Sequence, residues 1–429
     1  MEQTLKRTKL LDRVFFNAVR DEKFKSNRIS VNLITTLHHE TAAQNAIVPF
    51  ILRKGYAGCP DFTELNRRLA SLYGAALDAD VRKVGDDQII NLSVQSLDDR
   101  FTMENEQIIK ACCELLCGLL LEPKLVDGHF DPTDVELEKK YLIASIQAEI
   151  NEKRSYAINR CTQIMFAGEP AGVGRYGSEE MAEKITPETA YAAYQRLIET
   201  AQVEILFCGA GDPAVAESIF SHAFSKIQRG GTALPEMRVK ASGGEVKQVT
   251  DQLDVTQAKM VLGFTTGISG DQKKIAAARL MVAIYGGTPF SRLFLNVREK
   301  LSLCYYCAAR FDRAKGTVMV DCGIEDQNRQ KAYDEILKQL DIMKKNEYTQ
   351  EEFNAAKLSL RNSFDHIGDS LAGIEGWYLG QIITGEYRSP QEEADMIDKV
   401  TREEVVEAAS QVQLDTVYYL TGRGAEDHE

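Results

Sequence analysis

The same order of strand-like and helix-like segments occurs twice along the 429-residue chain, and this repeat limits the folds that the chain can adopt. In the first copy, a strand rich in β-branched residues is expected at 29–37. Helical periodicity then leads to a second strand at 87–97, and long helical segments follow it. The copy closes with an apolar strand at 203–209.

The second copy begins with a strand at 258–267 and ends with a strand at 416–422. Its spacing differs from that of the first copy, so the repeat is one of element order. This pattern predicts an α+β fold of two tandem, similar halves, each a mostly antiparallel sheet with helices packed on one face. We expect the halves at 1–235 and 236–429, because the segment 227–245 is polar and contains Gly and Pro.

Composition excludes several classes of protein. Hydrophobic residues make up 44% of the chain and charged residues 27%, which is enough apolar material for sizeable cores. The net charge of −13 without a basic block argues against a nucleic-acid partner. Apolar runs stay short of the ~20 residues that cross a membrane, and the charged N-terminus lacks a signal-peptide pattern. We therefore expect a cytoplasmic protein whose nine cysteines are free, buried thiols.

Metal-ligating and redox patterns are weak. His38, His39 and Glu40 form the one histidine cluster, but neighbouring side chains on a strand point to opposite faces, so surface residues before a turn are expected. Cys304 and Cys307 have the C-x-x-C spacing of redox pairs, yet they lie in an apparent strand whose alternation would place them on opposite faces. No metal site is predicted in this chain.

A weak dinucleotide-binding pattern, G-x-G-x-x-A, begins at Gly209. The stretch that follows lacks the second parallel strand that such a site needs. Asp212 as a helix cap and Pro213 as the first helical residue explain the segment without a ligand.

Arg298 and Tyr305 lie seven residues apart, and spacing alone leaves two interpretations open. In the structural interpretation, Arg298 caps an amphipathic helix and Tyr305 is a strand aromatic. In the functional one, the two side chains converge on a carbonyl and stabilise an oxyanion by charge and by an O–H donor.

The stretch SRLFLNVREKLSLCYY, at 291–306, resembles the "LF…LRE…gLaY" signature of pitrilysin/insulinase-type peptidases, which include the mitochondrial processing peptidases. The two-half repeat is similar to the same family, so the resemblance covers nearly the whole chain. The closing segment 415–422 and the residues around Glu138 resemble a bacterial branch that occurs as paired subunits. This resemblance implies that each chain forms half of a clamshell.

Active members of that family carry an inverse zinc motif, H-x-x-E-H, on an early helix and a third ligand, Glu, on a later one. Aligned on this resemblance, Ala46, Pro49 and Phe50 occupy the places of the first His, the base Glu and the second His. Glu138 is kept, but Ser145 stands where the third ligand belongs. The motif is absent at every register, so the chain resembles a member that has lost its metal centre.

The resemblance implies a catalytically inactive subunit that lends Arg298 and Tyr305 to the zinc site of a homologous partner and helps to cleave peptides. It implies no cofactor in this chain and zinc in the partner, with a heterodimer expected and a homodimer left open. One alternative is a peptide-binding or structural scaffold without a catalytic part. Another is a rearranged metal site built from His38, His39 and Glu40.

Overall fold

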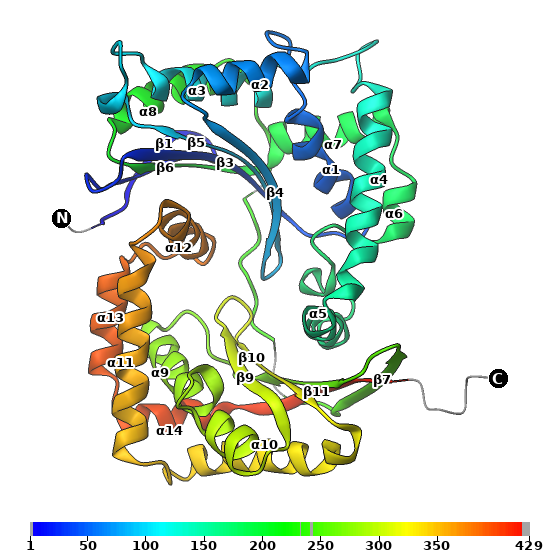
Figure 1. The fold of residues 1–429 in the computed structure, drawn as a ribbon, viewed down its shortest axis with the longest axis vertical. Coiled ribbons are helices and arrows are strands. Elements are labelled where there is room, and N and C mark those ends of the chain that lie inside the picture. Colours follow the sequence, from blue (N-terminus) through cyan, green and yellow to red (C-terminus); the bar gives the residue numbers. More distant parts are fainter. Residues whose placement is uncertain (1–2, 232, 241–242, 423–429) are drawn as a thin grey trace. The chain divides into compact units, whose positions relative to one another are not determined.

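The structure is a computed structural model that describes residues 3–231, 233–240 and 243–422. It contains two sheets and many helices (Figure 1), which confirms the predicted α+β class. Contacts divide the chain into two compact units, each assembled from three segments. The first unit comprises the described residues of Met1–Gln147, Val173–Glu236 and Ile367–Ser389; the second comprises those of Ala148–Gly172, Met237–His366 and Pro390–Glu429.

The sheet of the first unit has six strands in the order β1-β2-β6-β3-β5-β4. The strands are β1 (Lys6–Leu11), β2 (Val14–Arg20), β3 (Ser26–Thr36), β4 (Ala76–Val84), β5 (Asp87–Leu97) and β6 (Gln202–Gly209). The central strand β3 pairs antiparallel with β5 and β6, whereas β2 and β6 run parallel. The strands predicted at 29–37, 87–97 and 203–209 correspond to β3, β5 and β6.

Helices cover the sheet of the first unit and close its core. They are α1 (Ala42–Leu52), α2 (Phe62–Ser71), η1 (Asp99–Phe101), α3 (Ile108–Leu121), α4 (Pro132–Ala148), α6 (Glu179–Glu183), α7 (Pro187–Thr200), α8 (Pro213–Phe224) and α12 (Leu371–Ile383). The main core packs apolar side chains of α1, α3, α7 and α8 against one face of the sheet. Asp212 caps α8 by accepting a hydrogen bond from the Ala214 N–H, as predicted.

The sheet of the second unit has five strands in the order β7-β11-β8-β10-β9. The strands are β7 (Lys247–Leu253), β8 (Ala258–Thr265), β9 (Cys304–Asp312), β10 (Thr317–Ile324) and β11 (Gln413–Gly422). The central strand β8 pairs antiparallel with β10 and β11, whereas β7 and β11 run parallel. Five strands of the first sheet, β2-β6-β3-β5-β4, follow the same order and directions, which confirms the repeat of element order.

The second unit has its own set of helical segments. They are η2 (Glu149–Asn151), α5 (Lys153–Met165), η3 (Pro170–Gly172), α9 (Gln272–Val282), η4 (Ala283–Gly287), η5 (Leu293–Lys300), η6 (Asp326–Asn328), α10 (Arg329–Lys344), α11 (Gln350–Ile367), α13 (Pro390–Lys399) and α14 (Arg402–Gln411). Helix α9 packs against α14 and α13, and its apolar side chains are buried.

Each unit takes one helix from the far part of the sequence. Helix α12 contacts β6 and β3, and its Ile374 and Tyr378 pack with Leu206 in a second core of the first unit. Helix α5 contacts β8 and β11, and its Cys161 packs with Val261. The two compact units therefore differ from the contiguous stretches 1–235 and 236–429 in two segments, and each sheet carries a helix on its second face.

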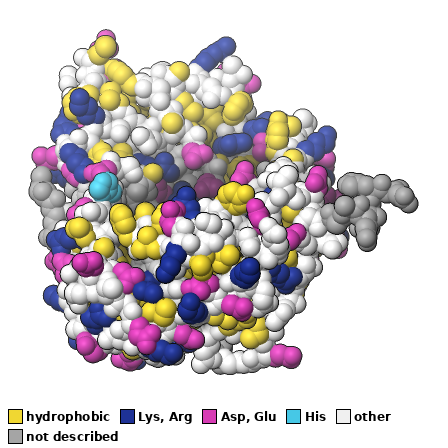
Figure 2. All heavy atoms as spheres, turned by 60° about the horizontal axis from the view of Figure 1, so that its bottom comes forward, with side chains coloured by type: hydrophobic (Ala, Val, Ile, Leu, Met, Phe, Trp, Pro, Cys, Tyr) yellow, Lys and Arg dark blue, Asp and Glu magenta, His cyan; other side chains and the backbone are white. Residues whose placement is uncertain are grey.

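Charge is distributed evenly over the face drawn in Figure 2, where acidic and basic side chains are interspersed. Among the described residues, no helix combines the length and apolar character needed to cross a membrane. The cysteines are free thiols, and eight of the nine are buried. This arrangement confirms the prediction of buried thiols.

Candidate functional site

The predicted site residues form two groups, one in each compact unit. Ala46, Pro49 and Phe50 lie on α1 and Ser145 lies on α4, both in the first unit. Arg298 lies on η5 and Tyr305 on β9, both in the second unit.

Helix α1 is an apolar core helix. Ala46 is fully buried, and Pro49 is a buried residue inside the helix, where it lacks the N–H that a regular helix uses. Phe50 is half-buried, and the Arg53 guanidinium lies 5.4 Å from the centre of its ring. Because methyl, pyrrolidine and phenyl groups have no lone pair for a cation, α1 offers no ligand at these positions.

Helix α4 carries the two remaining positions of the degenerate site. Glu138 is 2% exposed, and its carboxylate lies 2.7 Å from the Lys54 ammonium. Ser145 is exposed and donates its hydroxyl hydrogen bond to the Tyr141 carbonyl at 2.8 Å. A lysine of this chain therefore neutralises the one retained carboxylate. Together with α1, these residues do not fit a zinc ion, which needs about three protein ligands.

The histidine cluster lies where the sequence places it, in the turn between β3 and α1. His38, His39 and Glu40 are all exposed. Within residues 3–231, 233–240 and 243–422, no three His, Cys, Asp or Glu side chains come together in a way that holds a metal. The rearranged metal site therefore finds no ligand set in the described chain.

Arg298 and Tyr305 line one hollow of about 380 Å³ in the second unit. Glu299, Glu325 and Asn328 also contribute polar groups to its wall. The Tyr305 side chain is 64% exposed, and the Arg298 side chain is 41% exposed. The two side chains that the sequence singles out therefore share one surface and remain accessible from solvent.

Local contacts hold Arg298 against its own helix. Its guanidinium lies 4.6 Å from the centre of the Phe294 ring, and its Nε lies 3.4 Å from a Glu299 carboxylate oxygen. Both contacts are at the surface, so each contributes little and either can be exchanged for a contact with another negative group. The guanidinium is available to bind a carboxylate or a developing oxyanion.

The backbone around the hollow departs from regular structure at three successive places. Segment η5 is a π-helix, and the Leu301 N–H reaches back five residues to the Asn296 carbonyl at 3.2 Å. Ser302 has a φ of +49°, in the left-handed region that favours glycine. A register shift then interrupts the pairing of β9 with β10. Such irregularities concentrate at functional sites.

The register shift is a β-bulge at Tyr305. Tyr306 pairs with Gly323, and Cys304 pairs with Ile324, so Tyr305 has no partner of its own on β10. The extra residue reverses the alternation, and Cys304 and Cys307 are both buried. The prediction that these cysteines lie on opposite faces is therefore wrong, because a bulge adds one residue to the period of two.

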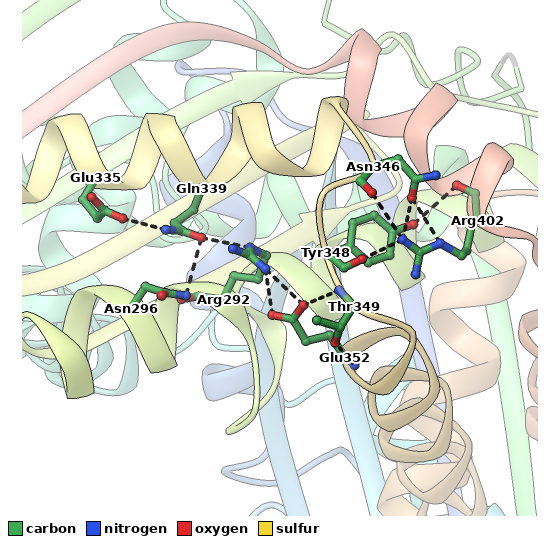
Figure 3. Close-up of polar contacts among 9 residues, drawn as sticks. All are labelled: Arg292, Asn296, Glu335, Gln339, Asn346, Tyr348, Thr349, Glu352 and Arg402. Carbon is green, nitrogen blue, oxygen red and sulfur yellow. Dashed lines mark hydrogen bonds and ion pairs between the residues drawn. The ribbon is translucent and has the colours of Figure 1, made fainter.

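A partly buried polar network anchors the start of η5 (Figure 3). The Arg292 guanidinium donates to both carboxylate oxygens of Glu352 on α11, at 2.8 and 3.0 Å, and to Gln339 on α10 at 2.9 Å. Asn296 of η5 donates to the same Gln339 oxygen at 3.5 Å. This network fixes the helix that carries Arg298. Sequence reasoning missed it, since Arg292 and Glu352 are 60 residues apart and no local pattern links them.

A second cluster in Figure 3 fixes the start of α14. The Arg402 guanidinium donates to the Asn346 side chain at 2.7 Å and stacks over the Tyr348 ring at 4.2 Å. It ties α14 to the connection between α10 and α11.

Comparison with known proteins agrees with this description. Residues 184–360 match the family described as "Peptidase M16 inactive domain". The "Probable inactive metalloprotease YmfF" of Bacillus subtilis (strain 168) is 29% identical over 405 residues, which are 94% of this chain and 95% of that protein. A conserved protein from Enterococcus faecalis V583 has a TM-score of 0.89 at 25% identity and covers 99% of this chain and 100% of its own.

A solved peptidase M16 inactive domain from Pseudomonas fluorescens shares the fold, with a TM-score of 0.78 at 18% identity over 98% of this chain and 99% of that one. The chain is similar to M16 peptidases, the pitrilysin/insulinase-type family that its sequence resembles. The matching family model and the Bacillus subtilis relative are both described as inactive.

Proposed function

We propose that this chain is the non-catalytic subunit of a heterodimeric M16 metallopeptidase. Arg298 and Tyr305 complete the zinc site of a homologous partner subunit, and the pair of subunits cleaves peptides. The supporting observation is the hollow in the second unit, whose wall contains both side chains in accessible positions. The described residues of the first unit offer no zinc ligand set, so the proposal assigns the metal to the partner.

The residues have the chemistry that the proposal requires. A guanidinium and a phenol can each donate a hydrogen bond to the oxygen of a scissile carbonyl as negative charge develops on it. The π-helix, the left-handed Ser302 and the bulge at Tyr305 hold the two donors in one hollow. A cytoplasmic location belongs to the same proposal, supported by the nine free thiols.

The test is peptide cleavage by a mixture of this chain and a zinc-motif homologue from the same organism. Arg298→Ala and Tyr305→Phe each lower kcat of the mixture by about 10²–10³-fold, the effect of removing one oxyanion donor. Arg361→Ala and Tyr387→Phe are matched controls: each alters an accessible residue outside the hollow and leaves turnover unchanged.

Binding measurements separate the proposal from its alternatives. Analytical ultracentrifugation of each mixture establishes that the variants still form the complex. Full activity of complexes that contain Arg298→Ala contradicts the shared site and supports a scaffold. Chelator-sensitive cleavage by this chain alone contradicts the assignment of the metal to the partner, and self-association without binding to the homologue supports a homodimer.

A further inference from the structure

The three cysteines nearest the hollow form a connected group. Cys304 and Cys307 lie on β9, and the bulge at Tyr305 puts both on the buried face of the strand. Cys322 on β10 is the direct partner of Cys307 across the strand pair. A row of three buried thiols therefore leads from inside the sheet to Cys304.

Cys304 is the member of this group that meets the hollow. It contributes to the wall beside Arg298 and Tyr305, and it retains 8% exposure. Cys322 is fully buried and Cys307 is 4% exposed, and neither contributes to the wall. Cys304 is therefore the one residue of the three that lines the hollow.

The surroundings of Cys304 stabilise its thiolate. The hydrogen bond with Cys307 lowers the pKa of Cys304 below the usual 9.0, against the opposing effect of burial, and the positive charge of Arg298 lowers it further. The same hydrogen bonds raise the pKa of Cys307, so Cys307 keeps its proton and donates. Elsewhere, burial raises the pKa of Cys112 to about 11. Thiolate character and access are the two properties that make a cysteine reactive.

We propose that Cys304 is a modification site, a reactive thiol that hydroperoxides oxidise to a sulfenic acid in the wall of the hollow. The thiolate sulfur attacks the terminal oxygen of the hydroperoxide, the S–O bond forms and the O–O bond breaks. Sulfur loses two electrons, and the leaving alkoxide or hydroxide takes a proton to become an alcohol or water. The product places a polar oxygen beside Tyr305.

Peptide mapping of the native full-length chain tests the proposal. Cys59 is a matched internal control, because it is 7% exposed, almost as Cys304 is, while burial and the charge of Glu64 raise its pKa. Near neutral pH we expect iodoacetamide to label Cys304 faster than Cys59 by about tenfold or more. After a pulse of hydrogen peroxide, dimedone labels Cys304 preferentially, and Cys304→Ala removes that adduct.

Two variants of Cys307 test whether its hydrogen bond is the reason for the reactivity of Cys304. Cys307→Ala removes the donor and slows labelling of Cys304 near neutral pH, whereas Cys307→Ser keeps a donor and preserves the rate. Labelling of Cys59 at or above the rate of Cys304, or equal rates in the two Cys307 variants, overturns the proposal. Circular dichroism of each variant verifies the fold. These readouts need neither partner nor peptide, so they are independent of the proposed function.

Discussion

The docking of α12 onto the first sheet depends on a buried ion pair. Removing one partner of this pair is expected to lower the free energy of unfolding. Glu375 of α12 is 1% exposed, and its carboxylate accepts a hydrogen bond from the Arg28 guanidinium of β3. Arg28 also donates to the Ser93 hydroxyl at 3.0 Å. Replacing Glu375 with alanine leaves the guanidinium without its counterion, at the position where α12 covers the sheet.

The expected cost follows from burial. Loss of one partner of a buried pair destabilises a protein by about 3–5 kcal/mol. The Arg28 side chain keeps 11% exposure and its bond to Ser93, so we expect the low end, about 3 kcal/mol, for Glu375→Ala. Glu375→Gln keeps an acceptor and costs about 1–2 kcal/mol. The double variant Arg28→Met/Glu375→Leu restores most of the loss, because an apolar pair carries no desolvation penalty.

The assay uses the single tryptophan of the chain, Trp377, which lies on α12 two residues from Glu375. Its indole N–H donates to the Arg388 carbonyl at 2.9 Å, so its fluorescence reports on this helix. Urea unfolding followed at Trp377 gives the free energy of unfolding for each variant. Glu180→Ala, which removes an exposed pair with Lys184, is the control and costs less than about 1 kcal/mol.

An unchanged urea midpoint for Glu375→Ala refutes this reasoning. So does a loss no larger than that of the Glu180 control. Either result means that apolar packing of α12 alone holds it on the sheet.

Three further perturbations have defined outcomes. Ser302→Gly relieves the left-handed φ of +49° and raises the free energy of unfolding by about 0.5–1 kcal/mol in urea denaturation; a loss of stability contradicts the strain. Burial opposes ionisation of Asp98, but hydrogen bonds from Arg100 and Asn27 lower its pKa below 3.8. The ionised carboxylate therefore stabilises the folded state above that pH, and this stabilisation is lost on acidification. The difference in free energy of unfolding between the wild type and Asp98→Asn therefore becomes smaller from neutral pH to about pH 3. A difference that stays constant over this pH range contradicts the lowered pKa of Asp98. Glu352→Gln weakens the Arg292 network and lowers the free energy of unfolding by about 1–2 kcal/mol, measured by urea denaturation followed by circular dichroism. The control Glu351→Gln changes an exposed residue and leaves this free energy unchanged within error. Equal effects of the two variants argue against a stabilising role of the network.

Local pattern predicted the elements whose apolar period is strong. Strand β5 coincides with the predicted 87–97, and β6 begins one residue before the predicted 203–209. Helices α5 and α12 were not predicted. Gly373, Gly376 and Gly380 weaken helix propensity in α12, so its sequence lacks a helical signature.

For the candidate site, too, some features could be predicted from the sequence and others could not. Residue identity alone establishes that Ala46 and Phe50 have no lone pair for a metal, whatever the fold. The opposite-face prediction for Cys304 and Cys307 failed, because one unpaired residue in a strand reverses all later side chains and has no sequence signature here.

The sequence by itself determined the repeated α+β architecture and the absence of a zinc motif, because periodicity and side-chain chemistry are local properties. Tertiary structure alone decided that α5 and α12 cover sheets formed by distant parts of the chain, and that Arg298, Tyr305 and Cys304 share one hollow. Those outcomes depend on which apolar faces pack together and on where a strand bulges. Both are set by long-range contacts that adjacent residues do not encode.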